Sequence, residues 1–227
     1  MDSIEITIRR TGAATAVAAK YLSRPEAKTM TICGAGNQGR ISLETILKVR
    51  PTVERVYVYD IDAGQAARFA REFSGQLHIE IEATENLAEA LSGSDICVTC
   101  TPSRKHFLNG EDIAPGTFIA GVGADSEEKQ ELDPKLLAAN KVVVDILDQC
   151  ASIGDLHHAL DAGLLTRSSV HAELGEVVAG KKAGRSSAAE IIIFDSTGMA
   201  LQDAATAIMV YEKAVNANRG VKHNFAQ

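Results

Sequence analysis

Short apolar runs alternate along the chain with longer stretches whose apolar residues recur at helical spacing. Runs of strand length occupy residues 29–34, 55–60, 78–83, 95–101, 116–123, 141–146 and 190–195. Between them, helical patterns cover residues 37–50, 63–73 and 87–94. Strands that alternate with helices in this way form a parallel sheet with helices on both faces. With right-handed crossovers, the pattern predicts a doubly wound, mostly parallel α/β sheet.

Two further helical patterns stand outside this alternation. Residues 10–24 are rich in alanine, and residues 199–217 also have helical spacing. One precedes the sheet and the other follows it, so we expect the two helices to flank the sheet together. The most polar stretch with glycines covers residues 178–190, where we expect a surface turn.

The composition argues against several classes of function. The chain has 227 residues, a net charge of −7 and 4% aromatic residues, and no block of Lys or Arg stands out. Nucleic-acid binding is therefore not expected. No apolar run reaches the length of about 18 residues that a membrane span needs, and the first ten residues lack the apolar region of a signal peptide. We therefore expect a cytoplasmic protein with no membrane partner.

Neither the cysteines nor the paired histidines are spaced as metal ligands. Cys97 and Cys100 form a C-x-x-C pair, but both lie in a predicted strand, where residues three apart point to opposite faces. We interpret the cysteines as buried thiols in a reducing compartment. His157 and His158 are interpreted as residues of a helix surface, so no metal is expected.

The strongest local motif is the stretch "TMTICGAGNQGR" at residues 29–40. An apolar run ends at Cys33, and Gly34, Gly36 and Gly39 follow with the spacing G-x-G-x-x-G. A strand before and a helix after are the context that a dinucleotide site requires. The three glycines then allow a tight turn, a close backbone approach to the pyrophosphate and close helix–strand packing. The phosphates would lie at the helix N-terminus, which favours anions.

An acid follows at the end of the next predicted strand. "RVYVYD" ends at Asp60, where a carboxylate can accept hydrogen bonds from the adenosine ribose. The same carboxylate would repel a 2′-phosphate, so NAD is expected and NADP is less favoured. Asp62 could take this role instead. The alternative interpretation is a structural glycine turn followed by a solvated acid.

The fourth predicted strand ends in "CTPS", which places Thr101 and Ser103 at the carboxyl edge of the sheet. Ligands bind at this edge in doubly wound folds. Thr101 is therefore a candidate cofactor contact, whereas Ser103 is also compatible with an ordinary loop.

Four stretches carry a more specific signal: "RTGAATAVAAKYL", "VGADSEEKQEL", "HAELGEVVAGKKAGR" and "FDSTGMALQD". Together, from about Arg10 to Ala214, they resemble the ornithine cyclodeaminase/mu-crystallin family, which includes a branch of alanine dehydrogenases. The resemblance implies binding of NAD(H) or NADP(H) and action on amino acids or cyclic imines. In the cyclodeaminase branch a hydride leaves ornithine, ammonia is lost and the hydride returns to give proline. In the dehydrogenase branch water attacks the imine and a keto acid results.

The resemblance also implies roles for individual residues. Asp125 matches the acid/base beside the substrate amine, and a carboxylate can hold an ammonium and move its proton. Lys129 matches a lysine that contacts the cofactor, although Glu127 and Glu128 stand here where the family commonly has Pro-Gly. Arg10 matches an arginine that contacts both cofactor and substrate carboxylate, and the neighbouring Arg9 leaves the register open.

The motif and the resemblance together predict two sets of binding residues. The cofactor set is Arg10, Thr11, Gly34, Gly36, Asn37, Gln38, Gly39, Asp60, Thr101, Gly123, Lys129 and Ser196. The substrate set is Arg10, Asp125, Thr197 and Gly198. For Ser196 and Thr197, which match a loop over the nicotinamide, helix capping is the alternative role.

Family members are usually longer at the N-terminus, so the resemblance also implies a division of the chain. Residues 1–24 would be the remainder of a substrate and dimerisation domain, residues 25–198 the dinucleotide-binding domain, and residues 199–227 a helix that returns to the first domain. Such a chain would expose apolar surface on its two terminal helices. A homodimer is expected if the N-terminal domain is present. The open alternatives are a cyclodeaminase, an alanine dehydrogenase, a ketimine reductase, or a non-catalytic NAD(P)-binding protein of the mu-crystallin type.

Overall fold

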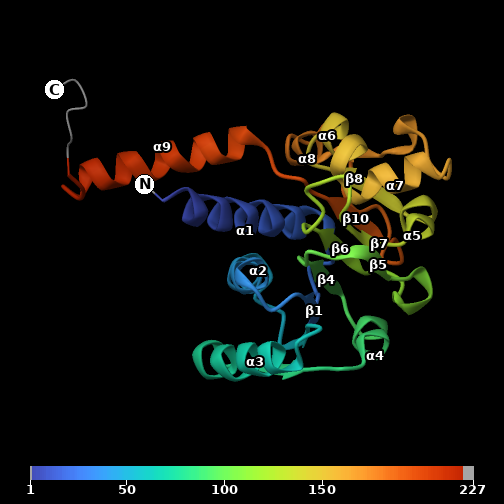
Figure 1. Cartoon of the computed structure of the whole chain (residues 1–227), viewed down its shortest axis with the longest axis horizontal. Coiled ribbons are helices and arrows are strands. Elements are labelled where there is room, and N and C mark those ends of the chain that lie inside the picture. Colours follow the sequence, from blue (N-terminus) through green and yellow to red (C-terminus); the bar gives the residue numbers. More distant parts are fainter. Residues whose placement is uncertain (1, 222–227) are drawn as a thin grey trace.

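A computed structural model describes residues 2–221 and shows an eight-stranded parallel sheet (Figure 1). The strand order is β3-β2-β1-β4-β6-β10-β8-β9. The strands of this sheet are β1 (Thr29–Cys33), β2 (Arg55–Tyr59), β3 (Glu80–Ala83), β4 (Ile96–Thr99), β6 (Phe118–Gly121), β8 (Lys141–Val144), β9 (Ala172–Glu173) and β10 (Ile192–Asp195). All the strand pairs are parallel. The doubly wound α/β fold predicted from the sequence is thus confirmed.

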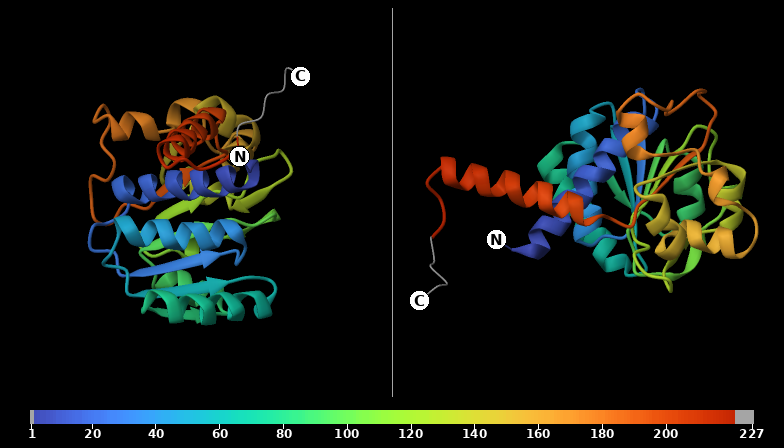
Figure 2. Two further views of the ribbon diagram at one scale, coloured as in Figure 1. Left: turned by 90° about the vertical axis from the view of Figure 1, so that its left-hand side faces the viewer. Right: turned by 90° about the horizontal axis from the view of Figure 1, so that it is seen from above.

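Helices cover both faces of the sheet (Figures 1 and 2). Their bounds are α1 (Ser3–Leu22), α2 (Asn37–Val49), α3 (Ala63–Leu77), α4 (Leu87–Ser92), α5 (Pro134–Ala139), α6 (Leu147–Ile153), α7 (Asp155–Asp161), α8 (Leu174–Val178) and α9 (Ala200–Asn216). Helices α1, α2, α3 and α8 contribute to the hydrophobic core on one face of the sheet, and α4, α5, α6 and α7 contribute to the core on the other.

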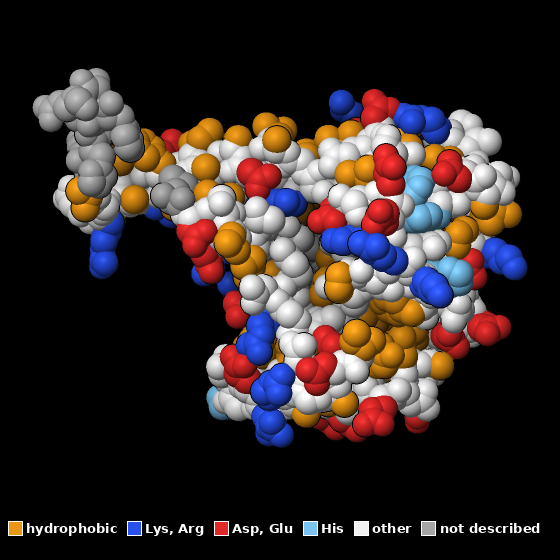
Figure 3. All heavy atoms as spheres, in the orientation of Figure 1, with side chains coloured by type: hydrophobic (Ala, Val, Ile, Leu, Met, Phe, Trp, Pro, Cys, Tyr) orange, Lys and Arg blue, Asp and Glu red, His pale blue; other side chains and the backbone are white. Residues whose placement is uncertain are grey.

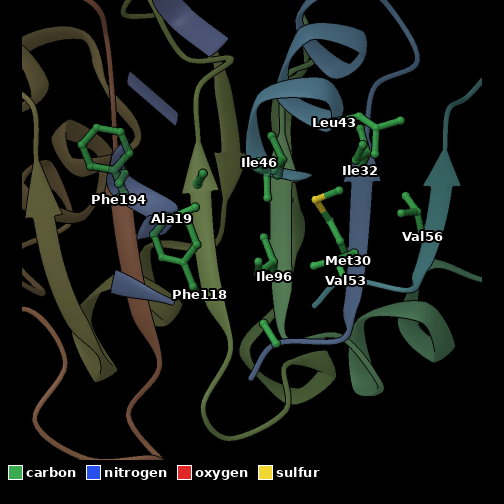
Figure 4. Packing of buried hydrophobic residues seen from close by; sticks show 14 of the residues in the cluster. Ala19, Met30, Ile32, Leu43, Ile46, Val53, Val56, Ile96, Phe118 and Phe194 are labelled. Atoms are coloured by element: carbon green, nitrogen blue, oxygen red, sulfur yellow. The ribbon is translucent and has the colours of Figure 1, made fainter. Parts of the chain in front are cut away.

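Alternation along the strands divides the side chains between these two cores. Val98 points into the first core, where Met30, Ile32 and Phe118 also pack (Figure 4), and its neighbour Cys97 points into the second. A strand buried on both faces has no solvent side, which explains why the strand sequences are continuous apolar runs. Cys100 contacts the first core, so the C-x-x-C pair faces opposite sides as predicted.

Helix α1 begins seven residues earlier than the predicted start at residue 10. The Asp2 carboxylate caps it by accepting a 2.8 Å hydrogen bond from the backbone N–H of Ile4. An i,i+4 ion pair between Glu5 and Arg9 supports the first two turns. The β-branched run at residues 4–8 obscured this start, because such residues have low helix propensity. Further along, a Cβ on Gly12 would lie 2.6 Å from Ile41 Cγ1, so the glycine permits close packing of α1 on α2.

Helix α9 runs beside α1, as expected for two flanking helices (Figures 1 and 2). None of its residues is buried, and it exposes several large apolar side chains (Figure 3). These are Leu201, Ile208, Met209, Val210, Tyr211 and Val215. Apolar surface on α9 was predicted from the sequence; α1 exposes less of it, at Ile4, Val17 and Tyr21.

The seven predicted strands are all present, with bounds shortened by one to four residues, but several small elements were not predicted. Strands β5 (Arg104–Leu108) and β7 (Gln130–Leu132) form a separate two-stranded sheet. Helices α5, α6 and α8 and strand β9 were also missed; each has at most seven residues, too short for a clear period. Of α7, the sequence predicted only that His157 and His158 lie on a helix. The stretch at 178–190 is a loop after Val178, and its last residue, Glu190, pairs with Lys141 at 2.8 Å.

Within residues 2–221, no helix is long and apolar enough to cross a membrane. The same residues contain no cluster of His, Cys, Asp or Glu that could hold a metal ion. The four cysteines are free thiols, three of them buried and Cys100 partly exposed.

Candidate functional site

The glycine turn joins β1 to α2 at the carboxyl edge of the sheet. Gly34 has a φ of 110°, which L side chains rarely adopt. A Cβ on Gly39 would overlap the carbonyl oxygen of Gly34, so this glycine lets the helix pack against the turn. Gly36 is the N-cap of α2, and a Cβ there would meet nothing within 4 Å. The space beside Gly36 and the free N–H groups of α2 together form a cradle for an anion.

Asp60 lies directly beside this turn. Its Oδ2 accepts a hydrogen bond from the backbone N–H of Ala35 at 2.8 Å, and its Oδ1 accepts one from Asp62 at 2.9 Å. The Asp62 side chain is instead the N-cap of α3, where it accepts from the N–H of Gln65. Of the two acids in "YDID", Asp60 is therefore the one that is tied to the glycine turn.

A cavity of about 570 Å³ opens next to Asp60. Its lining includes Gly34, Gly36, Asp60, Thr101 and Ser103. A second cavity, of about 200 Å³, continues on the far side of Thr101, and Cys100, Thr101 and Pro102 line both. The two cavities therefore lie next to each other along the carboxyl ends of β1, β4 and β6, where a doubly wound sheet binds its ligands, and together they are called the groove below.

The second cavity brings together most of the residues predicted from the family resemblance. It is lined by Arg10, Thr11, Gln38, Thr101, Gly123, Asp125, Lys129, Ser196, Thr197 and Gly198, and also by Thr7, Cys100, Pro102 and Val122. Asn37 and Gly39 line neither part of the groove: Asn37 faces a separate hollow that Arg9 also lines, and Gly39 supports the turn from within.

Arg10 lines the second cavity, whereas Arg9 faces the separate hollow beside Asn37. The Arg10 side chain is 15% exposed, and its Nε donates to Asp203 Oδ1 of α9 at 3.2 Å. Its Nη1 donates to Gln202 at 3.4 Å, and the backbone of Gly198 packs against the guanidinium. Helices α1 and α9 thus hold this cation at the end of the groove.

Asp125 and Lys129 form an ion pair at the mouth of the second cavity. Lys129 Nζ lies 2.6 Å from Asp125 Oδ1, and the Asp125 side chain is 60% exposed. The loop that carries them is held from beneath by His158, whose Nε2 lies 2.8 Å from the carbonyl oxygen of Lys129. His157 and His158 lie on helix α7, as predicted, and both are partly buried rather than fully exposed.

Residues 196–198 are held over the groove by a buried carboxylate that was not predicted. Asp145, at the end of β8, accepts hydrogen bonds from Ser196 Oγ at 2.9 Å and from the N–H of Gly198 at 2.7 Å. Thr197 Oγ1 donates to the other oxygen of Asp145 at 3.4 Å. The N-cap of α9 is Met199 and has no side-chain cap, so the alternative of helix capping by Ser196 or Thr197 is wrong.

Three more buried carboxylates, also missed from the sequence, lie behind the groove: Glu131, Asp155 and Asp195. Burial raises the pKa of all three, to about 7 for Glu131 and about 6 for Asp155. Asp195 accepts from the N–H groups of Asp155 and Leu156, and Asp155 accepts from those of Glu131 and Leu132. For Asp195, as for Asp145, the available signal was a single acid at the end of an apolar run, in "IIIFD" and "KVVVD" respectively.

Comparisons with known proteins identify the relatives of this chain. The model of the ornithine cyclodeaminase/mu-crystallin family matches residues 1–218. An alanine dehydrogenase of Archaeoglobus fulgidus is 42% identical over 99% of this chain and 69% of its own length. A Δ(1)-pyrroline-2-carboxylate reductase of Bacillus cereus is 37% identical, again over 99% of this chain and 69% of that protein.

Solved structures show the same fold. The Thermococcus litoralis Δ(1)-pyrroline-2-carboxylate reductase, in complex with NADH and L-proline, is 39% identical and superposes with a TM-score of 0.95 over 98% of this chain and 69% of that one. An archaeal alanine dehydrogenase dimer with bound NAD is 41% identical, with a TM-score of 0.94 over 99% and 69%. These relatives carry the cofactor that the sequence predicted. The chain belongs to the ornithine cyclodeaminase/mu-crystallin family.

Proposed function

We propose that this chain binds NAD(H) along the groove and supports hydride transfer between an L-amino acid and the corresponding imine. The observation that carries the proposal is the pair of adjacent cavities. One has the glycine turn with Asp60, and the other has Arg10, Asp125 and Lys129. The relatives with bound NAD or NADH support the choice of cofactor.

The residues of the first cavity fit a dinucleotide. Open space beside Gly36 leaves room for the pyrophosphate at the N-terminus of α2. The Asp60 carboxylate has lone pairs left after its two backbone hydrogen bonds, and these can accept from ribose hydroxyls. Its negative charge disfavours a 2′-phosphate, so NAD is proposed over NADP.

The residues of the second cavity suit an amino acid. NAD⁺ supplies the hydride acceptor when it is bound. Asp125 holds the substrate ammonium and takes its proton, and Lys129 pairs with the same carboxylate at 2.6 Å. Arg10 binds the substrate carboxylate, for which the Asp203 carboxylate is a competing partner within the chain. The loop at residues 196–198 limits the access of water from the side of α9.

Three reactions are proposed. Alanine oxidation and pyrroline-2-carboxylate reduction are favoured by the two relatives at 42% and 37% identity, and ornithine cyclisation is the third option within the family. A non-catalytic NAD(P)-binding protein is the second candidate. It is favoured by the small size of the second cavity. Among the described residues, two cations line this cavity, Arg10 and Lys129, and each already forms an ion pair within the chain.

We also propose the division of the chain into residues 1–24, 25–198 and 199–227. Helix α9 has no buried residue and exposes apolar side chains, which supports its assignment to a part of the molecule other than the central sheet. The archaeal alanine dehydrogenase is a dimer. A homodimer of this chain would appear by light scattering as twice the mass of 24.1 kDa.

Calorimetry with NAD⁺ and NADP⁺, followed by absorbance of NADH, separates these options. Net NADH from alanine supports the dehydrogenase, and consumption of NADH with pyrroline-2-carboxylate supports the reductase. Proline from ornithine without net NADH supports the cyclodeaminase. Binding of NAD⁺ with none of these products supports the non-catalytic candidate, and no binding of either nucleotide contradicts the whole proposal.

The substitution Asp125→Asn tests the acid/base role. We expect turnover to fall by about 10²- to 10⁴-fold, because the amide cannot take a proton, while the Kd for NAD⁺ changes little. Glu127→Gln, an exposed acid in the same loop, is the matched control and should keep full activity. Equal activity of Asp125→Asn and its parent would contradict the assignment.

A further inference from the structure

One buried carboxylate joins the strands that form the floor of the groove. Glu131 of β7 is fully buried and accepts four hydrogen bonds. Its Oε1 accepts from the N–H of Thr101 at 2.6 Å and from Thr101 Oγ1 at 2.7 Å. Its Oε2 accepts from Thr99 Oγ1 at 2.7 Å and from the N–H of Gly123 at 3.0 Å. Glu131 thus ties the carboxyl end of β4 to that of β6.

The position of these donors matters for the groove. Thr101 lines both cavities and so lies at their junction, and Gly123 lines the second cavity. Glu131 itself lines neither, so it acts only through the two backbone segments that it holds. A Cβ on Gly123 would lie 2.5 Å from the Glu131 carboxylate, which leaves no room for the segment to shift toward it.

The four donors match only an ionised carboxylate. A carboxylate is an acceptor at both oxygens, whereas a carboxylic acid must donate from one of them. The hydroxyls of Thr99 and Thr101 can rotate to accept that proton. The backbone N–H groups cannot, and one of them points at each oxygen: Thr101 at Oε1 and Gly123 at Oε2. Whichever oxygen is protonated, one fixed backbone hydrogen bond at the groove is weakened.

We propose that Glu131 is a positioning residue that keeps the floor of the cofactor groove in its binding conformation only while it is ionised, so that NAD binding releases a proton from this side chain. The inference rests on the proposed function, because it takes NAD as the ligand of the groove. By linkage, a ligand that prefers the ionised form lowers the pKa of Glu131, and a rise in pH strengthens binding.

The surroundings of Glu131 place this proton exchange near neutral pH. Burial raises its pKa to about 7, and the nearby Asp155 carboxylate of α7 adds to the rise. The other titratable groups that face it are the Cys33 thiol of β1 and the Cys100 thiol after β4, whose pKa values are raised, and neither carries a charge at neutral pH. On its own loop, Lys129 is paired with Asp125, and His158 of α7 contacts the Lys129 carbonyl oxygen. No cation among residues 2–221 forms an ion pair with Glu131.

Calorimetric titration of the whole chain with NAD⁺ at pH 5.5, 7 and 8.5 tests the proposal. We expect the parent to bind about tenfold more tightly at pH 8.5 than at pH 5.5, the effect of about one hydrogen bond. Titrations at pH 7 in buffers of different ionisation enthalpy should show release of a fraction of one proton. Glu131→Gln, which imitates the protonated side chain, should bind weakly at all three pH values and release no proton from this site. Glu131→Asp should restore part of the pH dependence.

Asp155→Asn is the second variant, and it keeps the test decisive if Glu131→Gln does not fold. Asp155 Oδ1 accepts from Glu131 and Leu132, which an amide oxygen can also do, and Oδ2 has no partner among the described residues. Removing the Asp155 charge should lower the pKa of Glu131, so the midpoint of the pH dependence moves to lower pH with the same amplitude. His158→Gln controls for titration of the histidine and should leave the midpoint in place.

The outcomes separate this inference from the proposed function. If the parent binds NAD⁺ at no pH, both are contradicted. If the parent binds with an affinity independent of pH, the inference alone is wrong. It is also wrong if Glu131→Gln lowers the affinity by a constant factor and keeps the pH dependence of the parent, because that is the effect of a purely structural residue. An unchanged midpoint in Asp155→Asn overturns it as well.

Discussion

The two ends of the groove are built by different means. At the end with Asp60, the backbone conformation depends on glycines, which have no side chain. Gly34 adopts a positive φ, and Gly39 allows α2 to pack closely against the turn. At the end with Asp125, the backbone is held by the buried carboxylates of Glu131 and Asp145. They accept hydrogen bonds from residues 99, 101, 123 and 196–198.

This difference has a physical consequence. Steric exclusion at a glycine turn does not depend on pH, whereas a buried carboxylate has two charge states with different hydrogen-bonding capacity. The first end should therefore respond to added volume and remain insensitive to pH. The second should respond to pH and to neutral analogues of its acids.

Gly39→Ala should have the largest effect at the first end. The added Cβ overlaps the backbone oxygen of Gly34 and lies 3.1 Å from Ile32 Cγ2, so no rotamer change can relieve it. We expect the free energy of unfolding to fall by about 3 kcal/mol or more, as measured by urea denaturation.

The matched control is Gly36→Ala, because its Cβ meets nothing within 4 Å and its φ of −79° suits alanine. Its stability should change by less than about 0.5 kcal/mol, while NAD⁺ affinity falls. Equal loss of stability in both variants would contradict the distinct roles of the two glycines.

The same contrast explains how much could be predicted from the sequence. The sheet was predicted from the apolar runs between residues 29 and 195. The glycine turn and its acid, Asp60, were predicted from residues 29–60 alone, because they stand in nearby positions of the sequence. The helix start at Ser3 was missed, because a cap at Asp2 and one ion pair outweigh the low propensity of the β-branched run that follows.

The carboxylates behind the second cavity could not be predicted in this way. Glu131 lies 30 residues from Thr101, and Asp145 lies 53 residues from Gly198. In the sequence "KQELD", Glu131 resembles any solvated acid, since nothing local shows that β7 is buried. The residues at the mouth of this cavity were found only through the family resemblance, and the acids that hold them needed the three-dimensional structure.

The pH dependence of stability should give the next largest effect, and only at the second end. The pKa of Glu131 is raised from 4.5 in the unfolded chain to about 7 in the fold, so the folded chain holds this proton more tightly. The stabilisation that comes from this bound proton is complete below pH 4.5 and is lost as the pH rises to about 7. The loss is on the order of 3 kcal/mol. Urea denaturation between pH 4.5 and 7.5 should show this decline in the parent and a smaller one in Glu131→Gln. Parallel curves for the two proteins would show that Glu131 does not titrate in this range.

Asp145→Asn should have the smallest of these effects, and it isolates the charge of the second end from its shape. Asp145 is buried; its Oδ2 accepts from Ser196 and Gly198, and its Oδ1 accepts from the N–H of Ile146. The amide of asparagine has only one oxygen, so it can accept the hydrogen bonds of only one of these two atoms. A backbone N–H then loses its acceptor, and the free energy of unfolding should fall by about 2 kcal/mol. Affinity for NAD⁺ should also fall, because the loop at residues 196–198 loses a hydrogen-bond acceptor that holds it.

The control is Asp62→Asn, which makes the same chemical change at the exposed N-cap of α3, where asparagine caps as well as aspartate. It should therefore leave both stability and affinity within error of the parent. If the two Asp→Asn variants behave alike, buried charge is not what distinguishes the two ends of the groove.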